Sequence, residues 1–262
     1  MQHGRIVEKD ERLKMTYCVG LYLDEGLVML ADTRTNAGVD NISTYSKTYT
    51  WEQEGERTIV LMAAGNLAIT QAVVNMLEEG LPLEDNDDGA PETMMTVPTM
   101  FQAARLVGRA VRQVHSEDAE AMRAQDTPFS ASFLLGGQLK GRTLRLFEVY
   151  AAGNFINATP DTPFLQIGEH KYGKPILDRV LCYDETTLMD GVKLALLSMD
   201  STVRSNLSVG FPLDLVIMGK DTQTIDLKTR IYENDPYFEQ LSSTWSDALR
   251  NAYLTLPPPD WM

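Results

Sequence analysis

The 262-residue sequence contains only two cysteines, Cys18 and Cys182, and three histidines. Two cysteines build neither a disulfide framework nor a cysteine-based metal cluster, and no Cys-x-x-Cys pair occurs. These absences predict a protein of the reducing cytoplasm without structural zinc. We also expect no other metal ion and no cofactor.

Positive charge is scarce as well. The sequence has 23 Lys and Arg against 37 Asp and Glu, which gives a net charge of −14. Nucleic acids and anionic membrane surfaces attract clustered positive charge, so we expect neither as a partner.

Long hydrophobic runs and a leader segment are also missing. The longest apolar runs, at 27–31 and 59–64, are far shorter than the ~20 residues that span a bilayer. Residues 1–14 carry charges along their length and contain no apolar stretch, so we expect no signal peptide.

Strands and helices are expected to come in groups along the chain. Four strands come first, in two hairpins, because β-branched and aromatic residues flank short turns. Two helices, three strands, two helices, two strands and a last helix follow. The expected strands are 16–23, 27–31, 45–51, 57–64, 129–137, 145–151, 164–168, 212–219 and 224–232. The expected helices run from Gly65-Asn66 to Gly80, from Thr96 and Pro98 to His115, over 174–181 and 187–204, and onward from Asp235-Pro236.

This order differs from the β-α-β alternation of a doubly wound parallel sheet. It predicts an α+β fold: a four-layer αββα sandwich of two antiparallel sheets flanked by helix pairs. No break in composition divides residues 16–253, so we expect one domain there. An N-terminal extension, 1–15, precedes it, and a Pro-rich tail, 254–262, follows it as an extended polyproline segment.

Three motifs match known sites only in part. Gly168–Lys174 fits the phosphate-loop pattern G-x-x-x-x-G-K, but Pro175 replaces the hydroxyl residue that binds magnesium. Asp85–Gly89 is similar to a calcium loop, but its glycine comes one residue early and no glutamate closes the loop. A serine-histidine-aspartate triad would need His115 or His170, and no G-x-S-x-G motif occurs. We favour none of the three sites.

Thr16, Asp32 and Lys47 are better candidates for a functional site. Thr16 opens the first expected strand, Asp32 follows the second, and Lys47 lies in the third. Because the first two strands form a hairpin, the start of one lies beside the end of the other. We therefore expect Asp32 to approach Thr16. Each residue alone is more typical of a solvated strand end, so the inference rests on the combination.

Two motifs resemble the proteasome β-subunit family. They are Thr-x-x-x-Gly from Thr16 and Gly-Leu-Val-x-x-Ala-Asp-Thr-Arg-x-x-x-Gly from Gly26, with a lysine 15 residues after the aspartate. The segment Asp32–Asn41 is similar to the bacterial branch called Anbu, the ancestral β subunit. The resemblance covers about Met15 to Tyr253 and is less specific in the second half. It implies the N-terminal-nucleophile hydrolase fold, which has the αββα layers expected above.

The resemblance also implies a function: a threonine peptidase or amidase that works within a homo-oligomeric ring or open helix. Thr16 would supply the nucleophile and, with its own α-amine, the base. Lys47 would keep both groups in their reactive forms, and Asp32 would pair with Lys47. Gly65 matches the family glycine whose backbone N–H binds the oxyanion. The implied partners are further copies of the chain and a peptide substrate.

Two segments depart from the family pattern. Gly168-Glu169-His170 stands where most proteasome β subunits carry Gly-Ser-Gly, and Ser205–Gly210 stands in place of Asp-x-x-Ser-Gly. Within it, Ser208 remains an expected partner of the Thr16 amine. Glu169 is the candidate replacement for the lost polar group. These departures keep a second interpretation open: a weak or inactive oligomeric scaffold of the same fold.

Both ends of the sequence carry a hypothesis of their own. Thr16 can use its amine only without residues 1–15. Either translation starts at Met15 and the methionine is removed, or 1–15 is a propeptide. We favour the first, because Thr is small enough for methionine removal and propeptides of this family usually end in Gly. At the other end, we expect Pro257–Met262 to pack on a neighbouring subunit through Trp261.

Overall fold

The computed structural model describes residues 16–36, 42–82 and 89–261. The expected N-terminal extension and most of the calcium-like segment at 85–89 lie outside the described residues. Among the described residues, no helix combines the length and apolar character that a membrane span requires.

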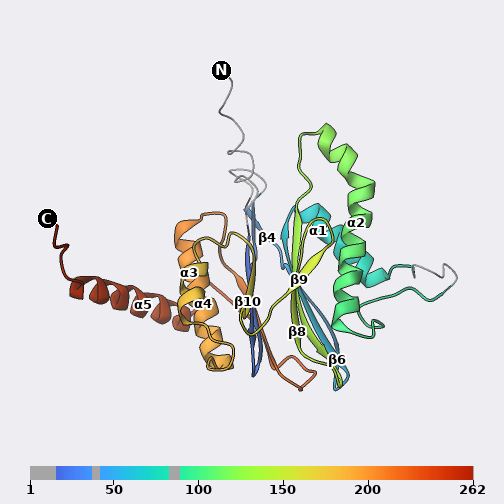
Figure 1. The fold of residues 1–262 in the computed structure, drawn as a ribbon. Helices are drawn as coiled ribbons and strands as arrows, with labels where there is room; N and C mark the ends of the chain where they lie inside the picture. The colour runs from blue at the N-terminus through green and yellow to red at the C-terminus, as the bar shows by residue number, and fades with distance from the viewer. Residues whose placement is uncertain (1–15, 37–41, 83–88, 262) are drawn as a thin grey trace.

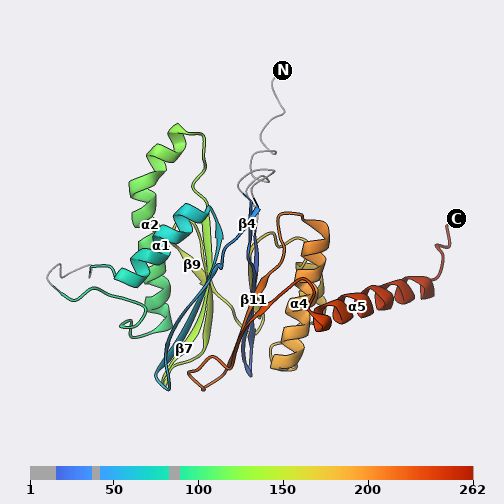
Figure 2. The same ribbon diagram turned by 180° about the vertical axis from the view of Figure 1, so that it is seen from behind.

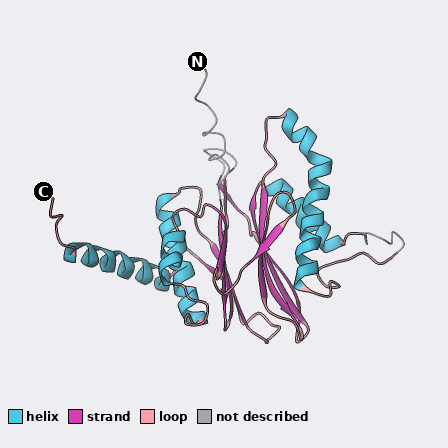
Figure 3. Ribbon diagram, in the orientation of Figure 1, coloured by secondary structure: helices cyan, strands magenta, loops and turns pink. Residues whose placement is uncertain are grey.

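Two antiparallel sheets of five strands each occupy the middle of the molecule (Figures 1 and 3). The first sheet has the order β10-β1-β2-β11-β12 and the second has the order β5-β6-β7-β8-β9. The first contains β1 (Tyr17–Leu23), β2 (Gly26–Asp32), β10 (Phe164–Gly168), β11 (Leu213–Gly219) and β12 (Leu227–Ile231). The second contains β5 (Thr48–Gln53), β6 (Arg57–Gly65), β7 (Ala131–Leu139), β8 (Arg145–Val149) and β9 (Phe155–Asn157). A separate pair joins β3 (Arg34–Asn36) to β4 (Ile42–Thr44).

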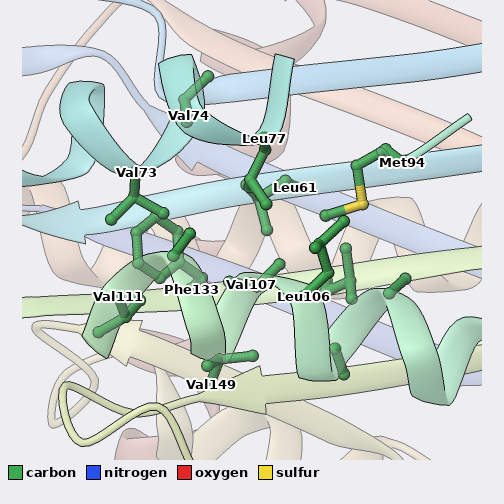
Figure 4. Packing of buried hydrophobic residues seen from close by; sticks show 14 of the residues in the cluster. Leu61, Val73, Val74, Leu77, Met94, Leu106, Val107, Val111, Phe133 and Val149 are labelled. Carbon is green, nitrogen blue, oxygen red and sulfur yellow. The ribbon is translucent and has the colours of Figure 1, made fainter. Parts of the chain in front are cut away.

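Two helices cover the outer face of each sheet. On the second sheet lie α1 (Leu67–Glu79) and α2 (Met100–Ala124), and on the first lie α3 (Lys174–Val180) and α4 (Leu188–Ser205). Figure 4 shows Val73 and Leu77 of α1 and Val107 and Val111 of α2 packed over Phe133 of β7. The predicted four-layer αββα sandwich is therefore confirmed.

Alternation along the strands explains how one sheet serves two apolar layers. In β1, Val19 and Leu21 point to one face and pack in the apolar cluster shared with α3 and α4. Cys18 points to the opposite face and packs in the apolar cluster between the two sheets. Met29 of β2 and Val60 of β6 meet Cys18 in that inter-sheet layer. Three apolar layers thus hold four structural layers together.

Several boundaries differ from the sequence prediction. α2 does not end at His115 but continues to Ala124, because the residues after it are good helix formers and Ala119 keeps contact with the core. The strand expected at 45–51 begins at Thr48, because residues 45–47 cross from β4 to the second sheet. Sequence patterns do not predict β3, β4 or β9, since three residues are too few to show alternation.

The last helix, α5 (Pro236–Thr255), projects away from the sandwich on the side of α3 and α4 (Figures 1 and 2). Asp235 caps its first turn by accepting a hydrogen bond from the Phe238 amide. Only Phe238 and Ser242 of this helix are buried. The helix passes the expected domain boundary at 253, and the residues that follow, 256–261, are exposed and non-helical.

Candidate active site

The residues singled out in the first part of the sequence meet at one end of the sandwich. Pairing of Cys18 with Ala31 places Thr16, just before β1, beside Asp32, the last residue of β2. Lys47 comes from the other sheet, directly before β5. The site is therefore assembled from both sheets.

The Lys47 ammonium lies at the centre of the site. Its Nζ donates to Thr16 Oγ1 (2.7 Å), to Asp32 Oδ1 (2.9 Å) and to the backbone carbonyl of Arg34 (2.7 Å). Thr16, Asp32 and Lys47 are 5%, 0% and 6% exposed, so little water reaches these contacts. Three acceptors match the three N–H donors of an ammonium group, and their attraction is strong in such a dry environment.

Asp32 is held by backbone groups as well as by Lys47. The amide of Tyr17 donates to Oδ1 (3.1 Å) and the amide of Gly210 donates to Oδ2 (3.3 Å). Burial raises the pKa of the Asp32 carboxyl, and the Lys47 charge and these backbone donors oppose that shift. A buried carboxylate with this many donors is a fixed partner for Lys47.

Gly65 ends β6 at the same end of the sandwich, directly before the helix cap Asn66. Its φ is +117°, and a Cβ here would collide with the carbonyl oxygen of Ser130, so only glycine fits. Two residues earlier, the Ala63 amide donates to the Lys47 carbonyl (3.0 Å). Gly65 is exposed and lies two residues beyond the amide that holds the Lys47 backbone.

Glu169 and Ser208 stand in different relations to Thr16. The Glu169 amide donates to the Thr16 carbonyl (2.7 Å), and the buried Glu169 carboxylate accepts from the Lys171 amide (3.3 Å) and Asn206 Nδ2 (3.4 Å). Ser208 is bound through its amide to Asn206 Oδ1 (2.9 Å). No hydrogen bond joins the Ser208 hydroxyl to Thr16 within the part of the chain that is described. The expected contact of Ser208 with a free Thr16 amine stays a prediction.

Asp214 is a residue near the site that no motif points to. Burial raises the pKa of the Cys18 thiol, Lys47 opposes this shift, and Asp32 and Asp214 add to it. Asp214 is thus within electrostatic reach of the same thiol as the ion pair. The signal in the sequence is a single carboxylate in the otherwise apolar strand Leu213–Gly219, where a buried charge requires a partner.

The glycines of the phosphate-loop-like segment Gly168–Lys174 have packing roles. Gly168 has a φ of +79°, and a Cβ there would collide with the Thr16 carbonyl. A Cβ on Gly173 would collide with the Ser198 hydroxyl. The segment leads from an antiparallel sheet, without the parallel strand-loop-helix unit of a phosphate loop.

The histidines have contacts of other kinds. His170 Nδ1 lies 3.3 Å from the Gly168 carbonyl, and the His115 ring packs edge-on against Phe129. Within the described ranges, neither histidine hydrogen-bonds to a serine or an aspartate. Across the same ranges, no three His, Cys, Asp or Glu side chains form a group that could hold a metal ion.

Known proteins with similar sequences and structures share this architecture. Residues 14–218 match the model of the proteasome subunit family. Proteasome subunit beta 2 of Pyrococcus furiosus is 26% identical over 211 residues, which cover 80% of this chain and 90% of that protein.

Solved structures of Anbu proteins give closer matches. A Gly-1 mutant of Anbu from Hyphomicrobium sp. strain MC1 is 52% identical, with a TM-score of 0.84 over 94% of this chain and 99% of that chain. Anbu (ancestral beta-subunit) from Yersinia bercovieri is 47% identical, with a TM-score of 0.85 over the same shares. A structure described as a helical assembly of the Anbu complex from Pseudomonas aeruginosa is 45% identical, with a TM-score of 0.84 over 93% and 98%.

The family match covers most of the chain, and the structural matches extend over nearly all of it at about half identity. The motifs that resemble this family contain Thr16, Asp32 and Lys47. These three residues also meet in the buried site. The chain therefore belongs to the proteasome subunit family and, within it, to the Anbu branch.

Proposed function

We propose that this protein is a threonine-type N-terminal-nucleophile hydrolase that cleaves peptide or amide bonds. The observation that carries the proposal is the contact of Lys47 Nζ with Thr16 Oγ1 at 2.7 Å inside a buried ion pair. A surface threonine has no need of a desolvated ammonium group, whereas a nucleophile gains from a positive charge that favours its alkoxide character.

The proposed reaction needs a chain that begins at Thr16. Its free amine takes the proton from Oγ1 as that oxygen attacks the substrate carbonyl carbon. The resulting oxyanion accepts a hydrogen bond from the Gly65 N–H. When the carbon–nitrogen bond breaks, the amine returns the proton to the leaving nitrogen, and an ester on Thr16 remains. Water, deprotonated by the same amine, then hydrolyses that ester.

Lys47 and Asp32 have electrostatic roles in this proposal. The Lys47 charge lowers the pKa of the Thr16 amine and of the Thr16 hydroxyl. A neighbouring cation disfavours the protonated, positive amine and favours the negative alkoxide. Asp32 keeps Lys47 in place and balances its charge. The Glu169 amide holds the Thr16 carbonyl. In the segment 205–210, Asn206 binds the Glu169 carboxylate and the Gly210 amide binds Asp32, so this segment supports Thr16 indirectly.

Self-assembly is the second part of the proposal. The Pseudomonas relative is described as a helical assembly, and we propose that this chain also forms a homo-oligomer, closed or helical. The projecting α5 supports this, because Tyr253, Leu254 and Leu256 are 72%, 70% and 68% exposed near its end. The free thiols of Cys18 and Cys182 accord with work in a reducing compartment such as the cytoplasm.

Removal of the Thr16 hydroxyl tests the nucleophile. We expect a chain beginning at Thr16 to hydrolyse members of an unstructured peptide panel, as followed by mass spectrometry. Thr16→Ala should lose this activity while its molar mass and circular dichroism stay unchanged, and Thr16→Ser should retain a part of it. The same test includes a mass-spectrometric determination of the N-terminal residue in protein isolated from cells. Turnover that survives in Thr16→Ala would contradict Thr16 as the nucleophile, and a persistent Met1 would favour the scaffold.

A further inference from the structure

The position of Lys47 depends on a segment that crosses between the two sheets. The Tyr45 amide donates to the Thr33 carbonyl on the side of the first sheet (2.9 Å), and the Lys47 carbonyl accepts from Ala63 in the second (3.0 Å). Ser46 lies between them. Residues 45–47 therefore span the gap, and how they are held decides where the ammonium group points.

Ser46 is tied to the first sheet by one short side-chain bond. Its Oγ donates to Asp214 Oδ2 at 2.8 Å, whereas its contacts with the Thr48 backbone are 3.4 Å. Asp214 stands on β11 directly opposite Ala31, the neighbour of Asp32. The anchor for Ser46 is thus one residue away in register from the carboxylate that pairs with Lys47.

Asp214 is itself held in one orientation. Arg230, its partner across β11 and β12, donates Nε to Oδ1 (2.8 Å) and Nη2 to Oδ2 (3.0 Å). A two-point guanidinium contact fixes the plane of a carboxylate. The Asp214 side chain is 11% exposed, whereas Ser46 and Arg230 are exposed, so the carboxylate is shielded from water by partners that themselves reach the surface. The Oδ2 lone pair left free by Arg230 is therefore directed at Ser46.

We propose that Asp214, oriented by Arg230, is a positioning residue that holds Ser46 and thereby keeps the Lys47 ammonium against Thr16. The effect on catalysis rests on the proposed function, whereas the effect on the position of Lys47 does not. An opposite-charge pair directly across two strands stabilises a sheet by itself. The bond to Ser46 is the added feature, and it can be removed while the ion pair stays.

A kinetic experiment isolates that bond. In the chain beginning at Thr16, Ser46→Ala removes the donor and Ser46→Thr restores it. Thr50→Val is the matched control, because Thr50 Oγ1 accepts a similar bond between the sheets from Lys228 (3.0 Å) but is not adjacent to Lys47. We expect Ser46→Ala to lower kcat about tenfold with little change in KM, because a displaced Lys47 would stabilise the transition state less while substrate binding stays the same. Thr50→Val and Ser46→Thr should keep most of the parent kcat.

A second measurement does not depend on turnover. Acetic anhydride acetylates lysines in proportion to their accessibility and their free-amine fraction, and peptide mapping reads each lysine separately. In the parent, Lys47 should react slowly relative to Lys140, whose side chain is 64% exposed. Ser46→Ala should speed acetylation of Lys47 several-fold, and Thr50→Val should leave it unchanged.

The two measurements separate the inference from the proposed function. A parent chain without turnover, combined with faster acetylation of Lys47 in Ser46→Ala, would contradict the hydrolase and support the positioning role. Equal Lys47 acetylation in Ser46→Ala, Thr50→Val and the parent would overturn the positioning role whatever the activity.

Discussion

Thr16 and Asp32 meet for a local reason, whereas Lys47 reaches them through tertiary structure. The β1–β2 hairpin sets the first pair side by side, as any hairpin would. Lys47 belongs to the other sheet and is brought in by the crossing segment at 45–47. A buried lysine and aspartate lower the stability of a fold unless every charge is matched, which explains the full set of hydrogen bonds around them.

At the residue scale, replacing Lys47 should change both the rate and its pH dependence. In a chain beginning at Thr16, Lys47→Ala should lower kcat/KM by ~100-fold or more, since it removes the group beside nucleophile and base. Loss of a nearby positive charge lets the pKa of the Thr16 amine rise. The rising limb of the kcat/KM profile, where the amine loses its proton, should therefore move to higher pH.

Lys228→Ala is the control for this measurement, because Lys228 is an exposed lysine on β12. It should leave the profile of the parent unchanged. A rising limb at the same pH in Lys47→Ala and in the parent would mean that Lys47 does not act on the amine. Lys47→Ala should also melt at a lower temperature, since Asp32 is then buried without its cation.

At the scale of elements, strand alternation places a carboxylate in an unusual position. On β8, Glu148 shares a face with Leu146 and is paired with Leu134 of β7, and both leucines belong to the inter-sheet layer. Burial raises the pKa of Glu148 to about 7. The neutral acid is therefore favoured in the folded protein over a wider pH range than in the unfolded chain.

This shift predicts a pH-dependent stability. A carboxyl whose pKa is higher in the folded state contributes stability below its unfolded pKa, near 4.5, and that contribution is lost as pH rises to about 7. Glu148→Gln, which stays neutral, should melt close to the parent at pH 5 and a few degrees above it at pH 8. Glu120→Gln, at an exposed position on α2, is the control. A difference in Tm between Glu148→Gln and the parent that is the same at both pH values would argue against the prediction.

Helix boundaries show the limit of element-scale reasoning. Asn66 and Gly80 bound α1 as expected, because an asparagine cap and a glycine with φ of +92° act through local geometry. The sequence predicts that α2 ends at His115, whereas the helix continues to Ala124, since nothing local terminates a run of helix formers at His115. His115 does not end the helix but packs edge-on against the Phe129 ring, a contact that forms only in the folded chain.

In the whole molecule, the sandwich buries its apolar faces, whereas the last helix, α5, leaves most of its surface exposed. Three apolar layers bury the sheets and four helices, but α5 is attached only at its base. There, Ser242 donates to the buried Asp200 of α4 (2.7 Å), and Arg204 donates to Ser242 (2.6 Å). This pair of hydrogen bonds directs α5 and its apolar end away from the body, and in the proposed assembly a neighbouring subunit would cover that end.

The C-terminal tail should therefore contribute to assembly. Trp261 is 81% exposed, and a proline-rich segment loses little entropy when it docks. Deleting Pro257–Met262 should reduce the molar mass measured by light scattering without changing the circular dichroism spectrum. Trp261→Ala should reduce it in the same direction, whereas Pro258→Ala should have a smaller effect. An unchanged oligomer after the deletion would show that the tail does not take part.

The fold class, most strands and helices, and the meeting of Thr16 with Asp32 can be predicted from the sequence. Those features depend on alternation, turn residues, caps and the motifs around Thr16, Asp32 and Lys47, all of which are local. Three further features are visible only in the folded chain: Ser46 binds Asp214 beside Lys47, the Glu169 amide binds the Thr16 carbonyl, and α5 projects from the body (Figure 1). These depend on which strands become neighbours and how two sheets stack, and contacts between residues more than 150 positions apart leave no periodic trace in the chain.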